Sequence, residues 1–283
     1  MLENLKGIAA DIDMTLTHKG GDLPQITKEA FNMLHRSGVL IGLATGRHLD
    51  EKLKNQGKAW GLDFEFDFLV ALNGGEVYDR KEERFWSTEM LSTDEMKKII
   101  CYMLPLINKY TIGVNAEGGN HSCMNISQDL IDSGKRHGWV MEDKTGDIDG
   151  FCDTPCFKML FRCEPVYEQE VRDTFLKEFG KNYQIIGTFP GTVEIMRKGI
   201  DKGSGLAMFA SWKGLSTDQF MTFGDNENDN TMLSCAGCGV CLKDGAELSK
   251  ACADEITEYS CLEGGVGHYL FDHVISGGKY SFN

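Results

Sequence analysis

Two carboxylates and a hydroxyl lie close together near the start of the chain, where Asp11, Asp13 and Thr15 follow the apolar run of residues 7–10. Such a cluster of charge is costly to hold together unless a cation or a proton compensates it. Beside a hard metal ion, an aspartate can act as a covalent nucleophile toward phosphate. The Asp-x-Asp pattern is also common in ordinary turns and helix caps, so the remaining sequence has to decide between these interpretations.

Further polar residues stand at the ends of other apolar runs or at the start of an expected helix: Thr45, Gly46, Arg47, Asn73, Lys202, Asp225, Asn228 and Asp229. Taken singly, each is typical of a turn or a solvated surface. In a parallel sheet, however, the carboxyl ends of the strands lie along one edge, and ligands bind there. The sequence therefore predicts that these side chains gather at one edge of a sheet.

Each of these residue types has a task in phosphoryl transfer. Carboxylate oxygens suit Mg²⁺, and Asp11 is placed to attack phosphorus. The ammonium of Lys202 would neutralise the phosphoryl oxygens, to which Thr45 and the Gly46 amide can donate hydrogen bonds. Asp13, two residues after the nucleophile, can protonate the leaving oxygen and later activate water. The set predicts a phosphoryl-transfer site.

The elements that position these residues alternate between strand and helix. Strands are expected at residues 8–10, 39–44, 68–72, 220–223 and 239–242, and helices at 27–36, 51–58, 202–212, 229–236, 246–253 and near 266. Alternation of this kind predicts an α/β fold, a doubly wound parallel sheet with helices on both faces.

The middle of the chain has a different pattern. Helices are expected at residues 93–108 and 165–179, and strands at 111–117, 121–126, 157–162, 183–188 and 192–196, with one hairpin turning at Gly118-Gly119. Residues 127–153 receive no assignment. Helix followed by hairpin, twice over, predicts an α+β unit on an open antiparallel sheet. We therefore expect a discontinuous core domain, residues 1–81 and 198–283, with an inserted domain at 82–197.

Composition limits the partners and the compartment. The 283 residues include 29 basic and 43 acidic ones, a formal charge of -14. An acidic protein repels nucleic acid and anionic membranes, so we expect neither as a partner. No apolar stretch has the length of a membrane span and no signal segment is evident, which favours the cytoplasm.

Ten cysteines are many for such a chain, and the tightest group is Cys235, Cys238 and Cys241. This spacing could indicate a zinc or iron–sulfur site. We favour small apolar fillers around a buried strand, because alternate strand residues point to opposite faces.

The ordered motifs resemble the haloacid dehalogenase superfamily, and within it the Cof-type phosphatases that carry a large α+β cap. The matching segments are 11–15, 44–47, 73–74, 201–203 and 224–229, followed by 232–240 and 264–267. One residue departs from the pattern, because Met14 stands where the family usually has glycine, a residue that eases a tight turn.

The resemblance implies a role for each site residue. Asp11 is then the nucleophile and Asp13 the general acid and base, and Mg²⁺ is held by Asp11, the main-chain carbonyl of Asp13, and Asp225. The implied phosphate ligands are the Ile12 amide, Thr45, Gly46, Lys202 and Asn228, with Asp229, Asn73 and Arg47 in support.

The expected function is Mg²⁺-dependent hydrolysis of a small phosphorylated metabolite, such as a sugar phosphate, pyridoxal phosphate or flavin mononucleotide, through an aspartyl phosphate. The inserted domain would act as a lid, with residues 117–121 and 189–192 as candidates for specificity; His121 among them is equally compatible with an ordinary surface position. A phosphomutase shares the same first step. A receiver-like signalling module and a non-catalytic metabolite sensor are alternatives of another class; a receiver needs no inserted domain, and a sensor is expected to have lost Asp11 or Asp13.

Overall fold

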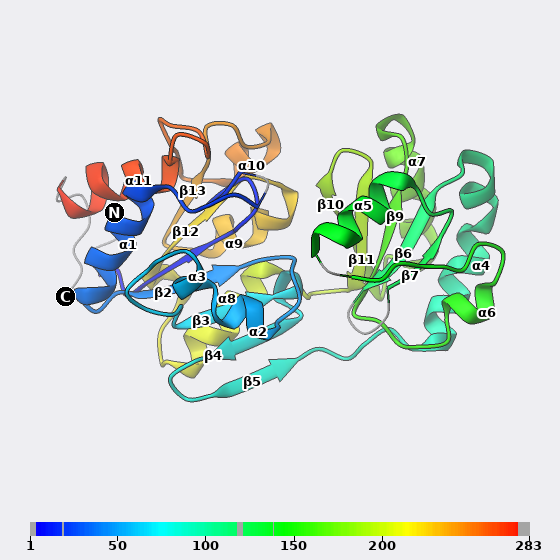
Figure 1. The fold of residues 1–283 in the computed structure, drawn as a ribbon, viewed down its shortest axis with the longest axis horizontal. Coiled ribbons are helices and arrows are strands. Elements are labelled where there is room, and N and C mark those ends of the chain that lie inside the picture. Colours follow the sequence, from blue (N-terminus) through cyan, green and yellow to red (C-terminus); the bar gives the residue numbers. More distant parts are fainter. Residues whose placement is uncertain (1–3, 19, 118–120, 138, 277–283) are drawn as a thin grey trace. The chain divides into compact units, whose positions relative to one another are not determined.

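A computed structural model describes residues 4–18, 20–117, 121–137 and 139–276 (Figure 1). Its larger sheet has the strand order β14-β13-β12-β1-β2-β3-β4-β5. Six strands run parallel: β1 (Gly7–Ala10), β2 (Leu40–Ala44), β3 (Phe68–Ala71), β12 (Phe220–Gly224), β13 (Cys238–Cys241) and β14 (Glu255–Ile256). The predicted α/β core is confirmed.

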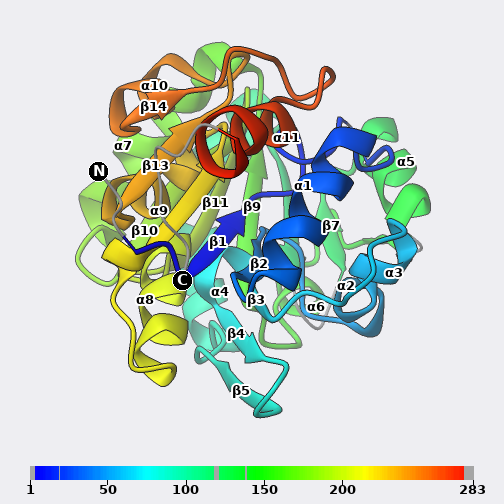
Figure 2. The ribbon, with the colours of Figure 1, turned by 90° about the vertical axis from the view of Figure 1, so that its left-hand side faces the viewer.

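Helices cover both faces of this sheet (Figure 2). On one face, Ile8 of β1 shares a buried cluster with Phe31 of α1 (Gln25–Arg36) and Val266 of α11 (Gly265–Tyr269). On the other face, Ala9 shares a cluster with Phe209 of α8 (Lys202–Trp212) and Met232 of α9 (Asn230–Cys235). A strand buried on both sides needs apolar side chains in both directions, which explains the continuous apolar run before Asp11.

Two strands of the sheet were not predicted. β4 (Glu76–Asp79) pairs antiparallel with β3, and β5 (Arg84–Ser87) pairs antiparallel with β4, so the sheet is mixed rather than wholly parallel. Both strands are short, and β5 is largely exposed, so neither produces an apolar run in the sequence. The predicted parallel sheet is thus extended at one edge by two antiparallel strands.

The remaining helices of the larger unit are short. They are α2 (Glu51–Lys54), α3 (Gln56–Ala59) and α10 (Glu247–Cys252). The expected helix at 51–58 is thus two short helices that meet at Asn55.

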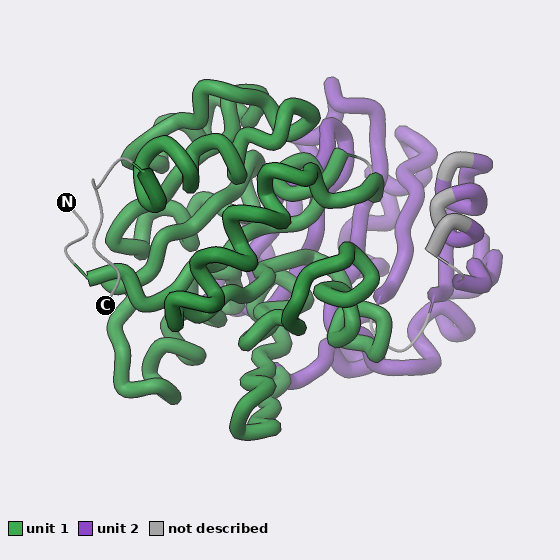
Figure 3. Tube along the Cα trace, turned by 60° about the vertical axis from the view of Figure 1, so that its left-hand side comes forward, with its two compact units in different colours: residues 1–87, 200–283 green, residues 88–199 purple. Residues whose placement is uncertain are grey.

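The chain divides into two compact units, coloured separately in Figure 3. The first comprises Met1–Ser87 and Ile200–Asn283, and the second comprises Thr88–Gly199. The second unit begins later than the expected residue 82, because β5 belongs to the sheet of the first unit.

The second unit is built on a six-stranded sheet of order β10-β11-β9-β6-β7-β8. Its strands are β6 (Gly113–Glu117), β7 (Ser122–Met124), β8 (Glu142–Asp143), β9 (Lys158–Arg162), β10 (Tyr183–Phe189) and β11 (Thr192–Arg197), antiparallel except for β7 and β8. The helices are α4 (Thr93–Tyr110), α5 (Gln128–His137), α6 (Ile148–Phe151) and α7 (Glu168–Phe179). The unassigned stretch 127–153 therefore contains α5, β8 and α6, whereas the turn expected at 118–119 lies outside the described residues.

One face of this second sheet is apolar. Val114, Phe161 and Ile195 share a buried cluster with Ile99 of α4 and Phe175 of α7. The residues between them in sequence, such as Asn115 and Glu194, belong to the other face, as the alternation of a strand requires.

The arrangement of the larger sheet places β1 between β2 and β12. The chain adds β2 and β3 on one side of β1 and later adds β12, β13 and β14 on the other side. Such a reversal of strand order is where ligands bind in open α/β sheets. The segment after β1 is therefore the expected place for a functional site.

Candidate active site

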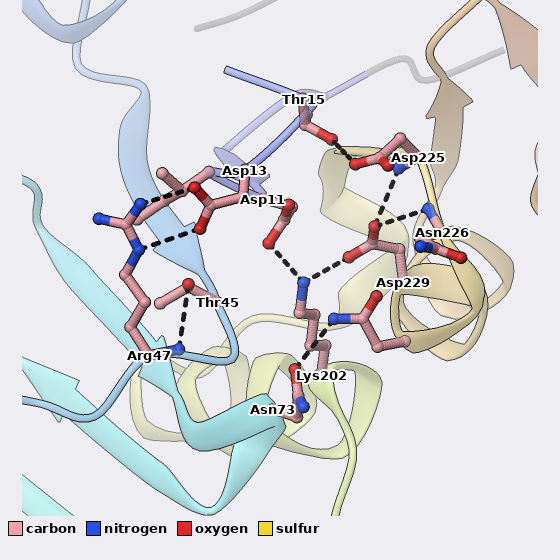
Figure 4. Close-up of polar contacts among 12 residues, drawn as sticks. Asp11, Asp13, Thr15, Thr45, Arg47, Asn73, Lys202, Asp225, Asn226 and Asp229 are labelled. Atoms are coloured by element: carbon pink, nitrogen blue, oxygen red, sulfur yellow. Dashed lines mark hydrogen bonds and ion pairs between the residues drawn. The ribbon is translucent and has the colours of Figure 1, made fainter. Parts of the chain in front are cut away.

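Residues from four segments meet at this edge of the sheet (Figure 4). Asp11 follows β1, Asp225 follows β12, Lys202 begins α8, and Asp229 ends the short 3₁₀ turn Glu227–Asp229. Lys202 donates hydrogen bonds of 2.6 Å from Nζ to Oδ1 of Asp11 and of 2.6 Å to Oδ1 of Asp229. The structure therefore brings together residues that are far apart in the sequence.

The first turn of α8 fixes the position of Lys202. Asp201 caps the helix by accepting a hydrogen bond from the Ser204 amide, and Ser204 Oγ accepts one from the Asp201 amide. Gly74 packs directly against this cap with a positive φ of 96°, and a Cβ there would lie 2.0 Å from the Asp201 carbonyl oxygen. Only glycine allows this approach.

The charged groups of the site have pKa values that are shifted from their usual ranges. Burial raises the pKa of Asp11 to about 7, an effect that Lys202 opposes and that Asp229 and Asp13 reinforce. Burial likewise raises the pKa of Asp225 to about 8, with added repulsion from Asp229 and Asp11. Burial disfavours the ammonium form of Lys202, yet the charges of Asp11 and Asp229 hold its pKa above its usual value. The site carries more negative charge than Lys202 alone compensates.

Three carboxylates are close enough to share a metal ion. One oxygen each from Asp11, Asp225 and Asp229 lie within 4.8 Å of one another. Among the described residues, the side-chain hydrogen bonds of Asp11 and Asp225 each use Oδ1, so Oδ2 of each can bind a cation. By contrast, Asp229 Oδ1 accepts from Lys202 and its Oδ2 accepts from the main-chain amides of Asp225 and Asn226. The donor set fits a hard divalent cation, with Asp11 and Asp225 as its best-placed ligands.

The Asp225 carboxylate is oriented by Thr15. The Thr15 hydroxyl is buried and donates a 2.7 Å hydrogen bond to Asp225 Oδ1. The sequence places Thr15 in the opening cluster but contains no signal for this partner, which lies 210 positions away.

Asp13 does not take part in the Lys202 network. Its Oδ1 accepts a 2.7 Å hydrogen bond from Nη2 of Arg47, and its Oδ2 accepts a 3.0 Å hydrogen bond from Nε. The sequence predicted Arg47 as a supporting residue and did not identify this partner.

Met14 adopts a backbone conformation that favours glycine. Its φ is 70°, in the left-handed region that favours glycine, and its amide donates a 2.8 Å hydrogen bond to the Thr17 carbonyl. The turn after Asp13 is thus formed despite the Cβ, at the cost of local strain.

The remaining predicted site residues lie on neighbouring strand ends. Ile12 and Thr45 are buried, and the Asn73 amide donates a 2.9 Å hydrogen bond to the Thr45 carbonyl. Asn228 donates a 3.1 Å hydrogen bond from Nδ2 to Asn73 Oδ1. A Cβ at Gly46 would lie 3.3 Å from the same Asn73 oxygen. Asn73 thus contacts both segments to which phosphate binding was ascribed.

The three clustered cysteines, Cys235, Cys238 and Cys241, do not resemble a metal site. Cys238 and Cys241 belong to the buried strand β13, whereas Cys235 lies in α9. Burial raises the pKa of Cys235 to about 11 and that of Cys241 to about 12, which keeps both thiols protonated. Among the residues that the structure describes, no potential metal-binding group includes a cysteine.

Comparison with known proteins gives consistent matches over most of the chain. The family of haloacid dehalogenase-like hydrolases matches residues 8–270. A Bacillus subtilis protein named 5-amino-6-(5-phospho-D-ribitylamino)uracil phosphatase YcsE is 26% identical over 263 residues, covering 92% of this chain and 93% of its own length. An HMP-PP phosphatase of Cronobacter sakazakii is 25% identical over 267 residues, with 93% of each chain covered.

The solved structures agree on the fold. The sugar phosphatase BT4131, of subclass IIB of the same superfamily, superposes with a TM-score of 0.77 at 22% identity, covering 94% of this chain and 98% of its own. In the described part of this chain, no helix is long and apolar enough to cross a membrane.

Proposed function

Because the chain belongs to the family of haloacid dehalogenase-like hydrolases, we propose that it is a Mg²⁺-dependent phosphatase of small phosphorylated metabolites. The observation that carries this proposal is the position of Asp11. It lies at the carboxyl end of the central strand, 2.6 Å from Lys202 and beside two further carboxylates. A carboxylate held between a cation and a metal-binding group is suited to attack phosphorus.

In the first step, a carboxylate oxygen of Asp11 attacks phosphorus in line with the ester oxygen. The new bond gives an aspartyl phosphate while the bond from phosphorus to the leaving oxygen breaks. Asp13 gives its proton to that oxygen, and Lys202 balances the charge on the phosphoryl oxygens. Thr45, the amides of Ile12 and Gly46, and Asn228 donate hydrogen bonds to these oxygens.

In the second step, Asp13 as a carboxylate takes a proton from water, and the water oxygen attacks phosphorus. The bond to Asp11 breaks, which releases inorganic phosphate and restores the Asp11 carboxylate. Asp13 ends protonated, ready for the next substrate.

A bound Mg²⁺ would supply positive charge against the phosphate and the buried acids. Asp11, Asp225 and the main-chain carbonyl of Asp13 would hold it. Asp229 instead orients Lys202, because both of its oxygens already accept hydrogen bonds from the protein.

The names of two relatives support a proposal for the class of substrate. YcsE is named for a phosphorylated ribityl compound and BT4131 is a sugar phosphatase. We therefore propose a sugar phosphate or a similar phosphorylated metabolite as the substrate, with pyridoxal phosphate and flavin mononucleotide also to be tried. None of the ten cysteines, all of which lie in the described residues, forms a disulfide. This fits the reducing cytoplasm, where we place the protein.

A phosphate-release screen tests the proposal. The protein is incubated with Mg²⁺ and a panel of sugar phosphates, pyridoxal phosphate and flavin mononucleotide, beside the Asp11→Asn variant. We expect the wild type to release phosphate from at least one compound and the variant to release none. Equal rates for both proteins would refute the assignment of Asp11, and an isomerised sugar phosphate without free phosphate would indicate a mutase.

A further inference from the structure

Arg47 binds both oxygens of the Asp13 carboxylate. Nη2 and Nε donate hydrogen bonds of 2.7 and 3.0 Å to Oδ1 and Oδ2, so the two planar groups face each other edge to edge (Figure 4). A fork of this kind fixes both the position and the rotation of a carboxylate, which a single contact from a lysine does not.

The backbone on the arginine side is itself fixed. The Arg47 amide donates a 3.2 Å hydrogen bond to Thr45 Oγ1, and the Arg47 carbonyl accepts a 2.8 Å hydrogen bond from the Leu72 amide. The arginine therefore projects from a rigid turn after β2. Asp13, in contrast, lies on the loop after β1, beside the strained residue Met14.

The exposure of the pair indicates that its purpose is not stability. The side chains of Arg47 and Asp13 are 27% and 35% exposed. Water screens an ion pair that is this accessible, so the pair contributes less to stability than a buried one would. A bidentate contact in such a place does more to orient the aspartate than to hold the domain together.

We propose that Arg47 is a positioning residue that holds the Asp13 carboxylate in the orientation required for proton transfer. This inference rests on the proposed function, in which Asp13 moves a proton in both steps. Proton transfer needs heavy atoms within about 2.6–3.2 Å, so a carboxylate free to rotate loses much of its effect. Arg47 acts through Asp13 and need not touch the substrate.

The two steps can be separated with p-nitrophenyl phosphate. Its leaving group departs without protonation, so the first step needs little help from Asp13, whereas attack by water still needs the base. We expect Arg47→Gln to release p-nitrophenol in a first turnover at a rate within about threefold of the wild type. Release of phosphate should slow by about tenfold or more, as part of the 10²–10⁴-fold that a positioned acid–base group contributes. The signature is a burst of p-nitrophenol equal to the enzyme concentration.

A double-mutant cycle shows whether Arg47 acts through Asp13. In an Asp13→Ala background, Arg47→Gln should cause no further loss of phosphate release, because there is no carboxylate left to orient. Losses that multiply would overturn the proposal. A higher KM for Arg47→Gln, with the rates of p-nitrophenol release and of phosphate release both unchanged, would also overturn it, since Arg47 would then be a substrate ligand.

Two further variants test whether the effect comes from the loss of the bidentate contact rather than from the loss of a positive charge or of any arginine. Arg47→Lys keeps the charge but offers no fork, and it should recover only part of the lost rate; full recovery would contradict the proposal. Arg36→Gln removes an exposed arginine that pairs with Asp63 on the surface, and it should behave as the wild type. Failure of the proposed function itself is distinguishable, because Asp11→Asn would then be as active as the wild type.

Discussion

The ammonium of Lys202 lies 2.6 Å from the carboxylate of Asp11, and both groups are buried at the carboxyl end of the central strand. A second carboxylate, Asp229, lies at the same distance from the ammonium. The single ammonium thus pairs with two carboxylates, and the negative charge that it does not compensate favours binding of a metal ion.

Removal of Lys202 should therefore affect both folding and turnover. Lys202→Met removes the cation that pairs with the buried carboxylates of Asp11 and Asp229, and breaking a buried pair in this way costs about 3–5 kcal/mol. We expect a loss of unfolding free energy of that size in urea titrations, together with a fall in kcat of at least about 100-fold. The matched control is Lys250→Met, because Lys250 pairs with the exposed Glu247 within α10, and its loss should leave the unfolding free energy close to that of the wild type. Similar losses for both variants would contradict this account.

Stability should depend on pH through Asp11 and Asp225. The pKa values of these carboxyls rise from 3.8 to about 7 and about 8 on folding. Since the metal-free folded protein holds protons that the unfolded chain has lost, its stability should fall as the pH rises from about 4 to 8.

Added Mg²⁺ should reverse this loss. It replaces the protons, so the increase in Tm caused by Mg²⁺ should be larger at pH 8.5 than at pH 6. Thermal unfolding with and without the ion measures this, and Asp225→Asn should show a smaller effect. An increase that is the same at both pH values would count against the metal site.

The strain at Met14 can be measured directly. Its φ of 70° suits glycine, so Met14→Gly should be within about 1 kcal/mol of the wild type in stability and should retain activity. Met14→Val places a β-branched residue in the same conformation and should destabilise the protein by about 1–3 kcal/mol. Chemical denaturation of the two variants gives the comparison. A valine variant as stable as the glycine variant would mean that the turn is not strained.

Much of this site could be predicted from the sequence, because the signals for it lie in short, continuous segments of the chain. Each apolar run that becomes a buried parallel strand ends abruptly in polar residues, so the segments after β1, β2 and β12 were identifiable. Their catalytic roles stay predictions, but the structure does bring Asp11, Lys202 and Asp225 to one edge of the sheet.

The partners within the site could not be predicted in the same way. Thr15 bonds to Asp225 across 210 positions and Arg47 bonds to Asp13 across 34, and no periodicity encodes such pairs. The strands β4 and β5 escaped prediction because both are short. β4 begins and ends on buried acidic residues and β5 is largely exposed, so neither forms an apolar run.

The Thr15 contact leads to a prediction on metal affinity. Thr15→Val keeps the shape of the side chain but removes the donor to Asp225 Oδ1, so the carboxylate is free to turn away from the ion. We expect about a tenfold loss of Mg²⁺ affinity, in the range seen when a residue that orients a metal ligand is removed. Calorimetric titration measures it, and Thr15→Ser should restore most of the affinity. Unchanged binding in the valine variant would show that Asp225 needs no such support.

The central claim, that Asp11 becomes phosphorylated during turnover, can be tested on the protein itself. The enzyme is mixed with Mg²⁺ and a substrate found in the screen, quenched in acid, reduced with borohydride and digested for mass spectrometry. Borohydride converts an aspartyl phosphate to homoserine, so we predict homoserine at position 11 and none without substrate. Unmodified Asp11 in an actively turning-over sample, or homoserine at another aspartate, would contradict the account.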